Sequence, residues 1–349
     1  IENVEVAAGV PTLMMGRNME NVSGGIDEDC LVQPLGVFAC VAPFNFPAMV
    51  PMWFLPYAIA CGNTYVMKPS DRCPMTQGLL FELLDGLGFP PGVVNLVHGG
   101  RAAVDALLDH PDVQGISFVG STPVARHLYA RGAAQGKRMQ CQAGAKNALV
   151  VMPDADPARA VDAILGSAFG SSGQRCLAGS LLIAVGEAYA PLVERLVPAA
   201  AAMQVGDGLD DSVEMGPVIS REAVDRVHRY IEGAVAEGAR LLLDGRGVRV
   251  PDRPHGFYVG PTILTDVRPD MAVACDEVFG PLLAILRADD LEGALEIIDA
   301  SPYGNAASIF TASGRAAREF RHRVRAGNVG VNIGVPAPIA SFPFSGMKQ

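Results

Sequence analysis

The chain has 349 residues, more than one hydrophobic core usually accommodates, so its length indicates two domains. Half of the residues are hydrophobic, 39 are glycine and 18% are charged, which excludes a disordered chain and is typical of α/β enzymes. The formal net charge of −10, without a block of basic residues, argues against nucleic acid or an anionic membrane surface as the partner.

The first sixty residues predict a projecting hairpin and a buried helix. Residues 1–5 have neither an initiator Met nor the order of a signal peptide, so we expect the sequence to begin inside a longer protein. Residues 18–34 have a turn at Gly24-Gly25 and predict a hairpin whose unpaired edge suits assembly into a homodimer or homotetramer. The apolar run 48–60 is too short for a membrane span and predicts a buried helix.

Residues 36 to 144 alternate short apolar runs with helical stretches, which is the pattern of a doubly wound parallel sheet. The strands that we predict are 36–41, 64–67, 93–97 and 115–119. Such sheets bind ligands at the carboxyl ends of their strands, where Lys68 follows the second strand. Gly120-Ser121-Thr122 stands where the last strand turns into a helix over 124–134, so free N–H groups there can face a pyrophosphate. We therefore predict that residues 1–144 are part of a nucleotide-binding domain.

A second α/β pattern covers residues 145–349, which we predict to be the catalytic domain. Its predicted strands are 148–152, 181–185, 282–286, 306–310 and 329–333. Between the second and third of these we predict a helix capped by Ser220, with an apolar face. That face consists of Val224, Val227, Ile231 and Val235. The predicted fold class is thus α/β, with two doubly wound parallel sheets and a small hairpin for assembly.

The segment Phe169-Gly170-Ser171-Ser172-Gly173-Gln174-Arg175-Cys176 carries the predicted chemistry. It follows a predicted helix that starts after Asp156, with Pro157 in its first turn. Its glycines let the backbone approach a ligand and leave the sulfur of Cys176 uncovered. A thiolate there can attack an aldehyde, and the resulting hemithioacetal can lose a hydride to nicotinamide and become a thioester.

The remaining cysteines and the histidines predict no metal site. Seven cysteines are an odd number, scattered without CxxC pairs, so neither disulfides nor a zinc site is indicated, and we expect a reducing cytoplasm. The six histidines form no HxxxH motif or ligand cluster. We interpret the cysteines other than Cys176 as small buried hydrophobic residues.

Five motifs in order resemble the aldehyde dehydrogenase superfamily. They are Pro43-Phe44-Asn45-Phe46-Pro47, Lys68-Pro69-Ser70, Phe118-Val119-Gly120-Ser121-Thr122, the octet ending at Cys176, and Glu277-Val278-Phe279-Gly280-Pro281. Each is short, but five in the same order across most of the chain are specific. The resemblance implies an NAD-dependent enzyme with Cys176 as nucleophile and the Asn45 amide as oxyanion donor.

The same resemblance implies a set of cofactor-binding residues. They are Ala42, Phe44, Lys68, Ser70, Asp71, Arg72, Gly120, Ser121, Glu277 and Phe279. Lys68 is implied to bind the adenosine ribose, and Glu277 with Phe279 the nicotinamide ribose. A carboxylate at Asp71 can accept from ribose hydroxyls and would repel a 2′-phosphate, which favours NAD over NADP.

One departure from hydrolytic members of that superfamily decides the expected product. Gln142 takes the place of the glutamate that activates water there, and an amide cannot take up the proton. A thiol needs less activation, so acyl transfer to coenzyme A remains possible. The chain most resembles the coenzyme A-acylating methylmalonate-semialdehyde dehydrogenase branch, in which Arg175 is implied to bind the substrate carboxylate and to lower the thiol pKa. That implies oxidation of methylmalonate or malonate semialdehyde, with loss of carbon dioxide, to propionyl- or acetyl-coenzyme A.

Two other functions stay open from the sequence: a hydrolytic, acid-forming aldehyde dehydrogenase, and a non-catalytic relative that shares only the fold. The resemblance also implies truncation at both ends. The segment before Ile1 is expected to supply part of the nucleotide sheet and a second substrate arginine, and the segment after Gln349 an assembly strand.

Overall fold

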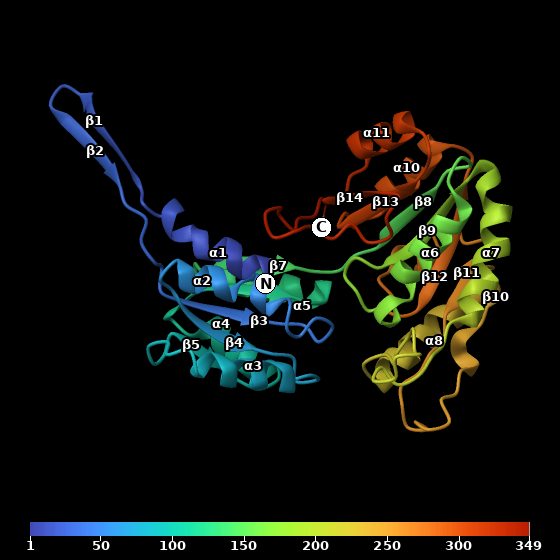
Figure 1. The fold of residues 1–349 in the computed structure, drawn as a ribbon, viewed down its shortest axis with the longest axis horizontal. Helices are drawn as coiled ribbons and strands as arrows, with labels where there is room; N and C mark the ends of the chain where they lie inside the picture. The colour runs from blue at the N-terminus through green and yellow to red at the C-terminus, as the bar shows by residue number, and fades with distance from the viewer. Residues whose placement is uncertain (349) are drawn as a thin grey trace. The chain divides into compact units, whose positions relative to one another are not determined.

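The computed structural model describes residues 1–348 and divides into two compact units, each with its own sheet (Figure 1). The first unit comprises Ile1–Gly144 together with Ile339–Phe342. The second comprises Ala145–Pro338 and the segment that follows Phe342. Both units are α/β with parallel strands, as the sequence predicts.

The sheet of the first unit is parallel throughout and has the order β5-β4-β3-β6-β7. Its strands are β3 (Val37–Val41), β4 (Thr64–Lys68), β5 (Val94–Leu96), β6 (Val113–Val119) and β7 (Arg138–Gln142). The first four confirm predicted strands, whereas β7, a polar strand at the sheet edge, was not predicted. Successive side chains of a strand point to opposite sides of the sheet. Ala39 of β3 therefore packs in the apolar core on one face of the sheet, and Cys40 packs in the core on the other face.

The strand order reverses beside β3. From β3 the chain passes to β4 and then β5 on one side, and it returns to β6 on the other side. The carboxyl ends of β3 and β6 therefore flank a topological switch point, the position at which open α/β sheets bind their ligands. The residues that follow these two strands are Ala42 and Gly120.

The helices of the first unit are α1 (Glu2–Leu13), α2 (Leu55–Ala60), α3 (Met75–Asp85), α4 (Arg101–Asp109) and α5 (Thr122–Ala134). The predicted buried helix over 48–60 is only partly correct. A 3-10 turn, η1 (Pro51–Trp53), and the short α2 replace it, and Ala48 and Met49 are exposed. Proline is tolerated in the first turn of a helix but not inside one, so Pro51 and Pro56 each begin a new piece.

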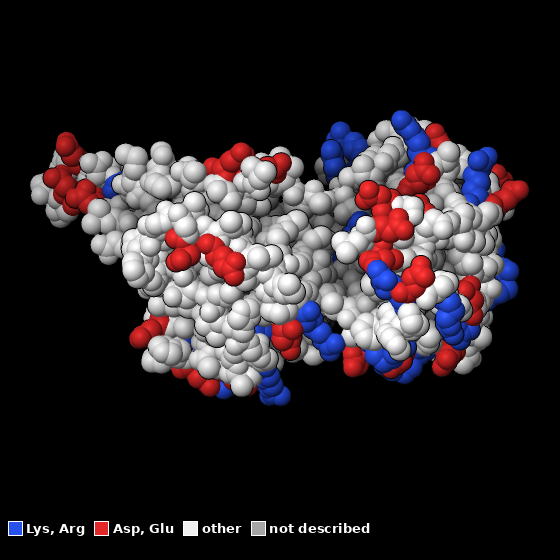
Figure 2. All heavy atoms as spheres, turned by 60° about the horizontal axis from the view of Figure 1, so that its bottom comes forward, with Lys and Arg blue, Asp and Glu red and all other residues white. Residues whose placement is uncertain are grey.

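The hairpin is an antiparallel pair, β1 (Arg17–Ser23) and β2 (Ile26–Cys30), and it confirms the predicted hairpin. All of its strand residues are exposed, including Met19 and Ile26. Acidic side chains gather on it (Figure 2).

The sheet of the second unit has the order β10-β11-β12-β9-β8-β13-β14 and is parallel except for β10. Its strands are β8 (Asn147–Val151), β9 (Gly179–Val185), β10 (Arg240–Leu243), β11 (Thr262–Thr265), β12 (Leu282–Ala288), β13 (Ala306–Phe310) and β14 (Asn328–Val331). Every predicted strand of this half is present, and β10 and β11 are additional. An apolar core covers each face of the sheet.

The helices of the second unit follow local signals that the sequence contains. They are α6 (Pro157–Ala168), α7 (Tyr189–Ala202), α8 (Arg221–Ala236), α9 (Ala272–Cys275), α10 (Leu291–Ala300) and α11 (Gly314–Arg323), with 3-10 turns η2 (Gly170–Gly173), η3 (Gly186–Ala188) and η4 (Gly245–Gly247). Ser220 caps α8 by accepting from the Ala223 N–H at 3.3 Å. Val235 is exposed rather than buried, because Ala234 occupies the inward position of that turn.

No helix within residues 1–348 combines the length and the apolar character needed to cross a membrane.

Candidate active site

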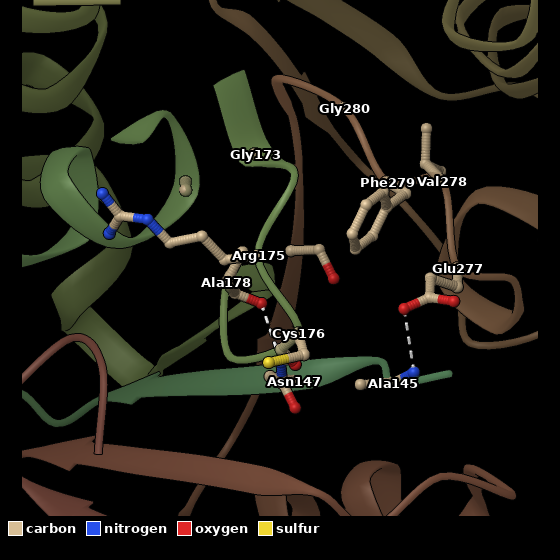
Figure 3. A pocket seen from close by; sticks show the side chains of 12 residues that line it. Ala145, Asn147, Gly173, Arg175, Cys176, Ala178, Glu277, Val278, Phe279 and Gly280 are labelled. Atoms are coloured by element: carbon tan, nitrogen blue, oxygen red, sulfur yellow. Dashed lines mark hydrogen bonds between the residues drawn. The ribbon is translucent and has the colours of Figure 1, made fainter. Parts of the chain in front are cut away.

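A pocket in the second unit contains Cys176, Arg175, Glu277 and Phe279 (Figure 3). Cys176 precedes β9, Glu277 and Phe279 precede β12, and Asn147, which also lines the pocket, opens β8. The pocket therefore lies at the amino-terminal ends of parallel strands, opposite to the usual edge. The sulfur-bearing residue is partly exposed, as the nucleophile assignment requires.

The loop that carries Cys176 is held in an uncommon backbone conformation. Ser171, Ser172 and Gly173 have φ values of 51°, 55° and 68°, the left-handed region. A Cβ on Gly173 would lie 2.2 Å from the Gly280 carbonyl oxygen, so glycine is needed for the loops before β9 and β12 to pack together. The Ser172 hydroxyl donates to the Gly216 carbonyl at 2.6 Å and fixes the loop from its other side. Such strain, stabilised by contacts, is common at functional sites.

Two asparagine amides converge on the backbone of Cys176. Asn147 Nδ2 donates to the Cys176 carbonyl oxygen at 2.9 Å, and Asn305 Nδ2 donates to the same oxygen at 2.8 Å. Neither was predicted from the sequence. Asn147 is 29 residues from Cys176 and Asn305 is 129 residues from it, so no local pattern connects either amide with the cysteine.

The electrostatics of the pocket favour a neutral thiol. Burial raises the pKa of Cys176 to about 11, and the Glu277 carboxylate adds to this, whereas the backbone N–H groups of Cys176 and Leu177 oppose it. Burial also raises the pKa of Glu277, whose Oε1 accepts from the Ala145 N–H at 3.0 Å. The buried Lys146 ammonium lowers the pKa of Glu277. Burial in turn lowers the pKa of Lys146 to about 8.

Arg175 turns away from the sulfur of Cys176 (Figure 3). Its Nε donates to the Ser171 hydroxyl at 3.2 Å and its Nη1 to the Gly166 carbonyl at 3.1 Å. Arg175 is not among the groups that shift the pKa of Cys176, so the expected lowering of that pKa by the guanidinium is not found. The reason is geometric, because the side chain is directed along α6 by these two hydrogen bonds.

Arg226 of α8 fixes the loop that carries Glu277. Its Nε donates to the Val278 carbonyl at 2.8 Å and its Nη2 to the Phe279 carbonyl at 3.3 Å. Phe279 has a φ of 55°, so this loop too is held in a left-handed conformation by its surroundings. Arg226 is a third residue that sequence reasoning missed, because nothing local connects a helical arginine with a loop 52 residues away.

The other predicted site residues lie in the first unit, around the carboxyl edge of its sheet. Lys68 is the last residue of β4 rather than the first after it, and its carbonyl accepts from the Ala42 N–H at 3.1 Å. Burial lowers the pKa of Lys68, and the nearby Asp71 carboxylate opposes this effect. Gly120 follows β6 next to the start of α5, with Ser121 in the N-cap position.

The neighbours of this edge complete the predicted set. Ser70 Oγ accepts from the Arg72 N–H at 3.3 Å, which forms the turn that presents Asp71. The Phe44 carbonyl accepts from Cys73 Sγ at 3.2 Å, and half-buried Asn45 follows it in the loop after β3. Gln142 ends β7, and its carbonyl accepts from the Gly120 N–H at 3.1 Å.

The polar groups at this edge of the sheet fit a dinucleotide. It offers an ammonium at Lys68, an exposed carboxylate at Asp71 and the free N–H groups of a helix start at Ser121. These suit ribose hydroxyls and phosphate oxygens. Gly120 has a packing reason as well, since a Cβ there would lie 2.5 Å from the Phe118 ring. Within residues 1–348, no group of three or more His, Cys, Asp or Glu side chains is arranged to hold a metal ion.

Comparisons with known proteins agree over the full chain. The model of the aldehyde dehydrogenase family matches residues 1–349. Malonate-semialdehyde dehydrogenase 1 of Geobacillus kaustophilus is 51% identical over 349 residues, which are 100% of this chain and 71% of that protein. The corresponding protein of Oceanobacillus iheyensis is 49% identical over 348 residues, with the same coverage of both chains.

Two solved structures have the same fold. The crystal structure of methylmalonate-semialdehyde dehydrogenase from Oceanimonas doudoroffii has a TM-score of 0.96 and 46% identity, over 99% of this chain and 71% of that chain. The NAD⁺ complex of an aldehyde dehydrogenase from Bacillus cereus has a TM-score of 0.93 and 31% identity, over 99% of this chain and 70% of that chain.

Proposed function

The chain belongs to the aldehyde dehydrogenase family, and from that premise we propose that it oxidises malonate or methylmalonate semialdehyde with NAD and transfers the acyl group to coenzyme A. For malonate semialdehyde, the products are acetyl-coenzyme A, carbon dioxide and NADH. For methylmalonate semialdehyde, propionyl-coenzyme A replaces acetyl-coenzyme A.

The observation that carries this proposal is the partly exposed Cys176 in a pocket bordered by Glu277 and Phe279. The thiolate attacks the aldehyde carbon and forms a hemithioacetal, and hydrogen-bond donors such as the backbone N–H of Cys176 stabilise the charge that develops on its oxygen. Loss of a hydride from the same carbon leaves a thioester on the sulfur. NAD supplies the hydride acceptor when it is bound.

Release of the acyl group distinguishes the proposed reaction from simple hydrolysis. Gln142 has no proton-accepting group, so water in this enzyme lacks the activation that a glutamate would provide. A thiol is a stronger nucleophile than water near neutral pH and attacks a thioester without such a base. Coenzyme A as the acyl acceptor therefore fits the chain better than water does.

We propose Arg175 as the residue that binds the substrate carboxylate. It lines the pocket beside Cys176, and a guanidinium can bind a carboxylate through two parallel hydrogen bonds. Its present partners are a hydroxyl and a carbonyl oxygen, which are neutral acceptors. An incoming carboxylate is a stronger acceptor and can draw the side chain toward the substrate.

The β1–β2 hairpin supports a proposal of self-association. Its strand residues are all exposed and include the apolar Met19, Val22 and Ile26. A second copy of the chain can pair with its unpaired strand edge and cover these side chains, which gives a homodimer or homotetramer.

The test measures NADH formation with malonate semialdehyde, in the presence and absence of coenzyme A, and identifies the product by mass spectrometry. We expect coenzyme A to raise the steady-state rate and to yield acetyl-coenzyme A. Without it, an acyl adduct should accumulate on the peptide that bears Cys176. Cys176→Ser is expected to abolish both signals, whereas Cys275→Ser, which changes an exposed cysteine outside the pocket, should retain them. A free acid formed at a rate that coenzyme A does not change would establish a hydrolytic aldehyde dehydrogenase instead. The absence of any NADH would favour a non-catalytic relative that shares only the fold.

A further inference from the structure

The peptide group between Cys176 and Leu177 is held at its carbonyl end. The amides of Asn147 and Asn305 donate to that oxygen at 2.9 Å and 2.8 Å. A carbonyl oxygen has two lone pairs, so these two donors occupy both acceptor positions. The described chain has no cis peptide bond, and in a planar trans peptide the N–H points opposite to the C=O. Fixing the carbonyl therefore fixes the direction of the Leu177 N–H.

That N–H acts on the sulfur. The backbone N–H groups of Cys176 and Leu177 both lower the pKa of the thiol against the larger effect of burial, as amide donors directed at a thiolate do. Glu277 is the charged group that raises this pKa, and the Arg175 side chain points away from the sulfur. Two donors on the carbonyl also polarise the peptide and strengthen its N–H as a donor.

The two asparagine amides cannot rotate freely, because their other atoms are bonded as well. Asn147 Oδ1 accepts from the Ala306 N–H at 3.0 Å. Asn305 Oδ1 accepts from Asn328 Nδ2 at 3.3 Å, and Asn328 also donates to the Ser345 carbonyl at 3.0 Å. This network joins the starts of β8, β13 and β14 to the segment after Phe342, all within the second unit. It leaves each Nδ2 directed at the Cys176 carbonyl.

We propose that Asn305 is a positioning residue for the nucleophile: its amide, together with that of Asn147, orients the Cys176–Leu177 peptide so that the Leu177 N–H stabilises the thiolate. Of the two, Asn305 is the better test position, because its side chain donates to the Cys176 carbonyl alone, whereas Asn147 also supports Ala178 and Ala306. The inference rests on the proposed function in that Cys176 is taken as the nucleophile.

The experiment follows alkylation of the free enzyme by iodoacetamide as a function of pH, with the peptide that bears Cys176 quantified by mass spectrometry. Asn305→Leu removes the donor at nearly constant volume. We expect the midpoint of Cys176 alkylation to move upward by about half a pH unit or more, so that the variant reacts several-fold more slowly at a fixed pH below it. Ile309→Val, a loss of one buried methylene on the strand that follows Asn305, is the matched control and should retain the native profile.

An alkylation profile of Asn305→Leu that coincides with the native one would overturn the proposal. If circular dichroism shows that this variant does not fold, Asn305→Ala, which introduces no bulk, is judged by the same criterion. Acylation of native Cys176 by semialdehyde and NAD is measured separately. An unacylated native protein would refute the proposed function, whereas the shift between native and variant titrations decides the positioning role independently of it.

Discussion

Gly173 is the position at which one added methyl group should affect the active site most. Its φ of 68° costs an alanine roughly 1 to 2 kcal/mol, because the Cβ of an L-residue crowds the following carbonyl there. The added Cβ would also lie 2.2 Å from the oxygen and 2.6 Å from the carbon of the Gly280 carbonyl. Both are backbone atoms, so no flexible side chain can move aside. The loops that carry Cys176 and Glu277 must separate by about 1 Å to restore van der Waals contact.

A displacement of this size at Cys176, the proposed nucleophile, is expected to lower kcat by about 100-fold. The assay is the steady-state formation of NADH from malonate semialdehyde, with thermal unfolding followed by circular dichroism. Gly233→Ala is the matched control, because a Cβ at that helical position of α8 meets nothing within 4 Å. It should leave kcat unchanged and stabilise the helix by up to about 1 kcal/mol. A Gly173→Ala enzyme with kcat close to the native value would refute the packing argument.

Three further changes test the charges and surfaces described above. Glu277→Gln removes a carboxylate that raises the pKa of Cys176, so alkylation of that thiol at pH 8 should become about two- to fivefold faster. Burial lowers the folded-state pKa of Lys146 from 10.5 to about 8, so the folded chain binds fewer protons than the unfolded chain between these values and the free energy of unfolding rises with pH there. Lys146→Met should therefore stabilise the protein most below pH 8, with the gain lost by about pH 10.5 in urea titrations. Lysines at both Met19 and Ile26 should shift the protein toward smaller species in sedimentation.

Each of these changes has a control of similar chemistry. Asp276→Asn removes the neighbouring carboxylate, which does not act on the Cys176 thiol, and should leave its alkylation rate unchanged. Lys137→Met removes a buried ammonium that donates to two carbonyl oxygens, so it should destabilise the protein where Lys146→Met stabilises it. Glu28→Gln on the hairpin should leave the sedimentation profile as it is. Slower alkylation in Glu277→Gln, a destabilised Lys146→Met or an unchanged assembly of the hairpin variant would each contradict the corresponding argument.

Much of the fold was predictable because it is encoded locally. The strands of both sheets that are apolar and buried on two faces, such as β3 and β13, are visible as short hydrophobic runs. The start of α6 is equally predictable from the sequence, since Asp156 accepts from the Ala158 N–H at 3.0 Å and Pro157 follows it. The polar edge strand β7 has no such pattern and was missed.

By itself, the sequence determined most of the buried strands, the N-caps of α6 and α8 and the identity of Cys176 as the candidate nucleophile, because these depend on neighbours a few residues away. Only the tertiary structure decided that the pocket lies at the amino ends of its strands, that Arg175 turns from the sulfur, and that Asn305 holds the Cys176 carbonyl. The physical reason is that the direction of a side chain, and a hydrogen bond across 129 residues, follow from how separate strands pack and from no local pattern.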